Sequence, residues 1–479
     1  MKSPLNKIKS IYIALALIAL CQQGLAKNDE LIKYTPFPDG YGYLKNVDDL
    51  AQQTNKGNID VVRKHAWSLW AGIMQPLEKS PWPIWYSWPN TQQAFQESNP
   101  VPVGDKNSQK KGHHIFKKGE TIRSRNKKNS TDVFNHSVMT KSPNYKLPTY
   151  ILDNFYKALC LTSKNVVSIC NGEHFLNNGD ILIPTESLSL EAFDSIRTNK
   201  FYLKSVLDNK KKDLNLETQF IVTKHMFWPV KAEGVTLVPV WKNNFSDSFY
   251  GYAGYEKWNT FVALDPSKPQ LIGQSVEGQF LFGVYDYSGN NLLPTIVKKA
   301  KLTSINDFYY HKVSQEDWDS FDKEDQAIIT ASSLWANNKP FEVGDYLVTI
   351  AMHVNTKEIP SWTLQSVWWS DTPNQGIYSE NRPDLPKAVG PWKHYLLTDS
   401  YDIPAINGMV KKAVNPYIEG VIHPIATSCR NCHIRAGLAG ASYQNKACKN
   451  LLVDLKVDGE CLKDIILTDF SWIIPDRSH

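Results

Sequence analysis

The stretch GDYLVTIAMHVN, residues 344–355, decides the fold, because it is rich in β-branched and aromatic residues and bounded by Gly, Asp and Asn. Such a stretch predicts a β-strand. Five more stretches of this kind lie between residues 150 and 400, at 200–207, 219–230, 236–241, 260–265 and 278–287. We therefore predict a mainly β domain over 150–400, with a β-sandwich-like arrangement and short helices around 316–336.

A helical and extended region precedes this domain, over residues 27–100. In VVRKHAWSLWAGIM the apolar residues Val62, Ala66, Leu69, Trp70 and Ile73 fall on one stripe, which predicts a helix. Pro76 should end it. The run PWPIWYSWPN then spaces three Trp residues by three, and its prolines favour an extended path that puts the rings on one face. A packed core is the favoured use of these rings, and stacking on sugars or a hydrophobic polymer is the alternative.

The first 26 residues have the pattern of a secretory signal peptide. Lys2, Lys7 and Lys9 precede an apolar run, and small residues follow it. Cys21 admits a lipoprotein, although the bulky Leu20 before it argues against lipidation, and a retained N-terminal anchor is the third alternative. We predict a periplasmic or secreted protein of the Gram-negative type, with no transmembrane segment in the mature chain.

Residues 101–149 form a basic loop or insert without apolar periodicity. Nine Lys or Arg residues lie within 106–128, against the single acid Glu120. The formal net charge of the whole chain is +5, so the rest of the mature chain is acidic. A nucleic-acid partner is therefore not expected, because it would need a basic face on the fold itself.

The decisive functional motif is Cys429-Arg430-Asn431-Cys432-His433. C-x-x-C-H is the attachment signature of c-type haem. On a helical turn, positions i, i+3 and i+4 share a face. Both thiols can then form thioethers with the haem vinyl groups while His433 becomes the proximal iron ligand. We predict one covalent haem c in a C-terminal segment, residues 401–479.

The other cysteines leave alternatives open. Export favours disulfides, and the simplest pairing joins Cys160 with Cys170 and Cys448 with Cys461, although sequence alone does not prove it. A zinc site made of Cys429, Cys432, Cys448 and Cys461 is a rival, but its second half lacks tight spacing. A thioredoxin-like pair would need a βαβ frame, which the sequence does not predict.

The sixth iron ligand must come from upstream of the motif or be absent, because no Met follows Met409 and the only later His is terminal. The candidates are His353, His423, Met409, Met352 and His394. Alternation along the predicted strand puts His353 and Met352 on opposite faces. Four histidines, His65, His225, His311 and His353, show no spacing typical of a second metal site.

Several segments resemble a family of large, secreted, single-haem bacterial proteins described as cytochrome c family. They are 344–371, 390–402, NPYIEG at 415–420, SCRNCHIRAG at 428–437 and TDFSWIIP at 468–475. The resemblance implies export and haem c, and it draws attention to His353, but it implies no particular reaction. The chain departs from the family where Ser370 follows Trp368-Trp369, a position at which relatives often have His.

The sequence therefore predicts a periplasmic monohaem cytochrome that transfers electrons or carries out haem-dependent redox chemistry. Its partner would be a redox protein or a small-molecule electron donor or acceptor. Whether it is an enzyme stays open, with a haem-dependent oxidoreductase as the possibility. The alternative is a secreted carbohydrate- or polymer-binding protein that holds a haem c. A hydrolase is not favoured, since neither G-x-S-x-G nor a paired-carboxylate signature is found.

Overall fold

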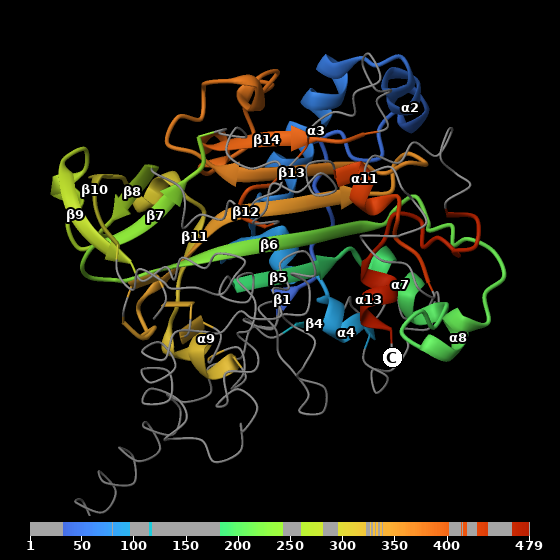
Figure 1. Ribbon diagram of the computed structural model, residues 1–479, viewed down its shortest axis with the longest axis horizontal. Coiled ribbons are helices and arrows are strands. Elements are labelled where there is room, and N and C mark those ends of the chain that lie inside the picture. The colour runs from blue at the N-terminus through green and yellow to red at the C-terminus, as the bar shows by residue number, and fades with distance from the viewer. Residues whose placement is uncertain are drawn as a thin grey trace, which may run out of the picture.

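A computed structural model describes most of the chain outside its N-terminus and several internal stretches (Figure 1). The described residues are 32–78, 80–95, 115–116, 183–242, 260–280, 296–321, 326, 329–330, 332–333, 336–337, 339–401, 413, 415–418, 429–438 and 462–478. The predicted signal peptide, nearly all of the basic insert, and Cys160, Cys170, His423, Met409, Cys448 and Cys461 lie outside these residues.

A six-stranded antiparallel sheet forms the centre of the molecule. Its order is β14-β13-β12-β6-β5, and β11 pairs with the free part of β12. The strands are β5 (Ile183–Leu188), β6 (Ile221–Val230), β11 (Tyr310–Lys312), β12 (Tyr346–Thr356), β13 (Thr363–Trp369) and β14 (Tyr395–Asp399). The predictions for 219–230 and 344–355 are confirmed as β6 and β12, which pair along their length. Both are long and mostly buried, as expected of central strands.

A smaller four-stranded sheet has the order β7-β8-β10-β9. Its strands are β7 (Thr236–Val240), β8 (Thr260–Leu264), β9 (Ser275–Phe280) and β10 (Ile296–Leu302). β8 and β10 are parallel, and the other two pairings are antiparallel. In Figure 1 this sheet lies beyond one end of the larger one, and both contribute to one hydrophobic core. The prediction of a mainly β fold is confirmed.

The N-terminal helix is also confirmed. α3 (Ile59–Ile73) follows the short α2 (Val47–Asn55), and the side chain of Asn58 caps its first turn by accepting from the Val61 N–H. The five apolar residues of the predicted stripe are all buried. α3 contacts β13 and β14 and covers the back of the larger sheet in Figure 1.

The Trp-rich run after α3 differs from the predicted extended path. β2 (Pro76–Leu77) and β3 (Ser80–Pro83) form a hairpin, and a 3-10 helix, η1 (Ile84–Ser87), follows. A 3-10 helix also has three residues per turn, so spacing alone did not distinguish the two. α4 (Thr91–Phe95) follows η1, and the short strands β1 (Ile32–Lys33) and β4 (Ile115–Phe116) pair with each other.

The strand predicted at 200–207 is wrong. That stretch forms a turn and then α8 (Lys204–Asp208), just after α7 (Leu190–Thr198). Phe201, Tyr202 and Leu207 are buried in a second, smaller core. A short apolar run of this kind does not tell a strand from a helix by its periodicity. The strand predicted at 278–287 is β9 up to Phe280, and the remainder lies outside the described residues.

The remaining elements are short. They are η8 (Pro269–Leu271), η9 (Ile305–Asp307), α9 (Gln315–Ser320), η10 (Ile377–Ser379), η11 (Trp392–His394), α11 (Cys429–His433) and α13 (Ile473–Arg477). α9 lies at the start of the predicted helical stretch at 316–336. Within the described part of the chain, no helix combines the length and apolar character needed to cross a membrane.

Candidate functional site

The C-x-x-C-H motif forms the short helix α11, as the sequence predicts. Its two cysteines, Cys429 and Cys432, are not joined in a disulfide and are partly exposed. The sulfur of Cys429 lies 3.5 Å from the carbonyl oxygen of Ala413. The amide of Arg430 donates to the Ser400 hydroxyl at 3.2 Å, which anchors the start of α11 beside the end of β14. The helix also contacts β13.

The C-terminal segment packs along the other side of α11. Backbone hydrogen bonds join this segment to the residues just after α11: Thr468 N donates to Ala436 O and Leu438 N to Ile466 O, both at 2.8 Å. The indole N–H of Trp472 donates to the carbonyl oxygen of Cys432 at 3.1 Å. The TDFSWIIP segment, which the sequence singles out only through a family resemblance, therefore packs against the motif.

A backbone carbonyl holds the ring of His433. Its Nδ1 lies 2.7 Å from the carbonyl oxygen of Phe470. A carbonyl oxygen only accepts hydrogen bonds, so Nδ1 carries the proton, and the neutral ring has its lone pair on Nε2. Histidines that bind a metal through one ring nitrogen commonly donate the other N–H to a carbonyl or carboxylate. His433 is therefore held in the tautomer that an iron ligand needs.

The two thiols and this tautomer fit a covalent haem c. Each thiol can supply one thioether sulfur, and His433 can supply one imidazole nitrogen to the iron. A zinc site with Cys448 and Cys461 would involve residues that lie outside the described part of the chain. The sequence does not predict the Phe470 contact, because the acceptor of the His433 Nδ1–H is a main-chain oxygen, which every residue type carries.

The larger sheet places His353 on the same face as α11. Leu188, Val222, Asn355 and Leu364 form one row across four paired strands, and Cys429 packs against the core that includes this row. The next row of that face contains Glu186, Lys224, His353 and Ser366. His353 is half-buried there. Figure 1 shows α11 in front of the ends of β12 and β13, with α3 behind the sheet.

Met352 and His394 lie elsewhere. Met352 is fully buried on the opposite face, where its sulfur lies 3.1 Å from Nδ1 of His225. His394 precedes β14, whereas Ser400, the contact of α11, follows it. Five strand residues at about 3.3 Å each separate these ends by about 17 Å. Of the sixth-ligand candidates among the described residues, His353 is therefore the one on the same face of the sheet as the motif.

Three of the four histidines considered for a second metal have separate partners. His65 lies between the Tyr401 hydroxyl at 2.8 Å and the carboxylate of Glu358 at 3.3 Å. His311 pairs with Asp317 at 2.8 Å. His225 contacts Met352 and the Thr349 hydroxyl. Among the described residues, no group of three His, Cys, Asp or Glu side chains is placed to hold a metal ion.

The three Trp residues of the Trp-rich run are core residues, as favoured from the sequence. Trp82, Trp85 and Trp88 are at most 3% exposed. Trp82 stacks on His311 at 3.8 Å between ring centroids, and Trp85 stacks on His225 at 4.3 Å. Their faces are covered by protein, so they do not form a surface on which a sugar or polymer could stack.

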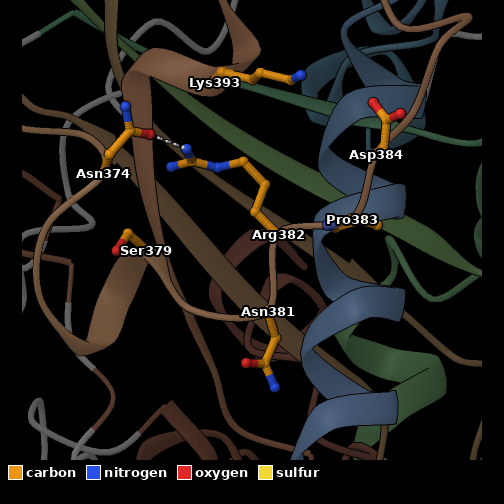
Figure 2. A pocket seen from close by; sticks show the side chains of 7 residues that line it. All are labelled: Asn374, Ser379, Asn381, Arg382, Pro383, Asp384 and Lys393. Carbon is orange, nitrogen blue, oxygen red and sulfur yellow. Dashed lines mark hydrogen bonds between the residues drawn. The ribbon is translucent and has the colours of Figure 1, made fainter.

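A shallow polar pocket lies away from the motif, between η10 and η11 (Figure 2). Arg382 lies at its centre and donates to Asn374 Oδ1 at 2.8 Å and to Tyr395 O at 2.9 Å. Its guanidinium lies over the ring of Trp67, 4.5 Å from the centroid. Burial and then the nearby charge of Arg63 lower the pKa of Arg382 to about 10. None of the residues predicted from the sequence to bind haem lines this pocket.

The chain was compared with models of protein families, with curated proteins and with solved structures, and none of them matches. The motif and its surroundings are therefore the features that indicate a function.

Proposed function

We propose that this protein is an exported monohaem c-type cytochrome, with its haem held by Cys429, Cys432 and His433. The observation that carries the proposal is the 2.7 Å contact between His433 Nδ1 and Phe470 O at the end of a C-x-x-C-H helix. The motif alone occurs by chance in unrelated proteins. A motif helix with two cysteines outside any disulfide and a histidine already held in the ligand tautomer is much more specific.

When bound at these residues, haem c would supply one-electron redox chemistry. The thiols of Cys429 and Cys432 would anchor it, and His433 Nε2 would face the iron. The carbonyl of Phe470 keeps the proton on Nδ1, and the smaller core excludes water from one side of α11. A redox protein or a small-molecule donor or acceptor would exchange electrons with this site.

His353 is the sixth ligand that we propose. It lies on the face of the sheet that α11 covers, one row from the residues that pack with Cys429. Its half-buried position suits a ligand that must reach a group at the edge of the fold. Met409 and His423 stay candidates from the sequence and are compared with His353 in the same experiment.

The first test is covalent attachment. The chain would be exported together with a haem-maturation system and extracted with acidified acetone. We expect the haem to stay with the protein and to be lost in the Cys429→Ala/Cys432→Ala variant, because no thioether can form. Arg430→Ala, which changes the same helix without removing a thiol, is the control. Haem that extracts from the unaltered chain, or none at all, would contradict the proposal.

The spin state tests the sixth ligand. If His353 binds the iron, the oxidised protein is low-spin, and His353→Ala converts it to a high-spin species that binds added imidazole. His394→Ala, on the far side of β14, should leave the spectrum unchanged. A low-spin spectrum that survives His353→Ala but not Met409→Ala or His423→Ala would assign the ligand to that residue. A high-spin unaltered chain would point instead to an open site and to haem-dependent chemistry on small molecules.

A further inference from the structure

The turn that presents Phe470 to His433 has an unusual backbone. Asp469 and Phe470 have φ of 52° and 63°, in the left-handed region. Asp enters this region fairly readily, but a bulky aromatic residue does so rarely. Such conformations are strained and persist only where the surroundings impose them. The turn therefore needs an anchor.

The anchor is the side chain of Asp469, which is buried with three donors. Lys357 Nζ donates to Oδ1 at 2.7 Å, and Leu216 N donates to Oδ2 at 2.7 Å. The indole N–H of Trp362 adds a longer contact to Oδ1 at 3.4 Å. Lys357 also donates to Pro360 O at 2.7 Å, which fixes the lysine to the loop between β12 and β13. The side chains of Lys357 and Asp469 are 6% and 8% exposed.

We propose that Asp469 and Lys357 are positioning residues that hold the Phe470 carbonyl on His433 and thereby set the reduction potential of the haem, an inference that rests on the proposed function. A hydrogen bond from Nδ1–H to a carbonyl makes the imidazole a stronger donor to the metal. A stronger donor favours ferric over ferrous iron and lowers the potential. Releasing the carbonyl should therefore raise it.

Two variants separate positioning from simple charge. Asp469→Ala removes the anchor together with a negative charge, so both effects raise the potential. Lys357→Met removes a positive charge, which by itself would lower the potential, whereas release of the turn raises it. The sign of the shift in Lys357→Met is thus decisive. Asp469→Asn keeps the size and the tolerance of positive φ, and should shift the potential less than Asp469→Ala.

The control is Asp213→Ala. Asp213 accepts from the amide of Leu467 at 2.8 Å, so it anchors the same C-terminal segment, but it is exposed and does not hold the turn. Covalent haem content, the reduction potential by spectroelectrochemical titration, and the solvent exchange of the His433 Nδ1 proton by NMR would be measured on each full-length, haem-loaded protein.

We expect the potential of Asp469→Ala to rise by about 59 mV, which is a tenfold change in a one-electron equilibrium. The potential of Lys357→Met should also rise, and the Nδ1 proton of His433 should exchange faster in both variants. Asp213→Ala should match the unaltered chain. A fall in Lys357→Met, or unchanged potentials and exchange in proteins that keep covalent haem, would overturn the inference and leave the cytochrome intact. An unaltered chain without covalent haem would overturn the proposed function instead. If Asp469→Ala is not exported, Asp469→Asn and Lys357→Met decide.

Discussion

At the scale of single residues, His225 shows how burial fixes a charge state. It is fully buried, stacked on Trp85 and within 2.7 Å of the Thr349 hydroxyl. Burial lowers its pKa from 6.5 to about 3, so the folded protein keeps it neutral. Between these values the unfolded chain binds a proton that the folded chain does not. The free energy of unfolding therefore falls as the pH falls below 6.5, by up to about 1.4 kcal/mol per pH unit.

We expect His225→Phe to be less stable than the unaltered chain at pH 7, because Thr349 loses its partner, yet to show a weaker pH dependence. Urea unfolding midpoints between pH 7.5 and 4.5 would measure both effects. His394→Phe is the control, since His394 is 39% exposed on its side chain. Equal slopes in the unaltered chain and in His225→Phe would contradict the expected role of this residue.

The sequence predicts only those parts of the candidate site that depend on the type of side chain. Cys429, Cys432 and His433 follow from their spacing, and the structure places all three on one helix. Phe470 lies 37 residues from His433 and contributes its main-chain oxygen, so its type gives no signal. Asp469 acts through Lys357, which is 112 residues away. Contacts of this kind depend on the completed fold.

At the scale of elements, periodicity succeeded where an element is long. β6, β12 and α3 span 10, 11 and 15 residues, and each was predicted from its pattern. The prediction at 200–207 was wrong because the apolar side chains of this stretch fit a strand or a short helix equally well. Lys200, before this helix, has a positive φ that turns the chain. The pattern of apolar residues does not predict such a turn.

α3 also shows why burial is harder to predict than helix formation. Arg63 is charged and does not belong to the apolar stripe of α3, yet it is only 4% exposed. Its guanidinium donates to the Asp399 carboxylate at 2.9 Å and to the carbonyl oxygens of Leu397 and Tyr378. A buried charge needs such partners, and these come from β14 and η10, more than 300 residues away in the chain.

At the scale of the whole molecule, the larger sheet separates two packed regions. Its back face carries α3 and the main core, and its front face carries α11 and the smaller core (Figure 1). The Arg63–Asp399 pair joins the N-terminal region to the last strand of the sheet on the back face, with side chains 5% and 0% exposed. We therefore expect that stability and the proposed haem site can be perturbed independently of each other.

Arg63→Met tests this separation. Removing one partner leaves the carboxylate of Asp399 buried and unpaired, so we expect a loss of about 3–5 kcal/mol in the free energy of unfolding. Lys64→Met, its exposed neighbour on α3, should change it by less than about 0.5 kcal/mol. Urea titrations would measure both. Because Arg63 acts on the back of the sheet, the haem spectrum and reduction potential of folded Arg63→Met should equal those of the unaltered chain. A shifted potential without a loss of stability would mean that the two faces are coupled through β14, where Asp399 adjoins Ser400, the hydroxyl that anchors α11.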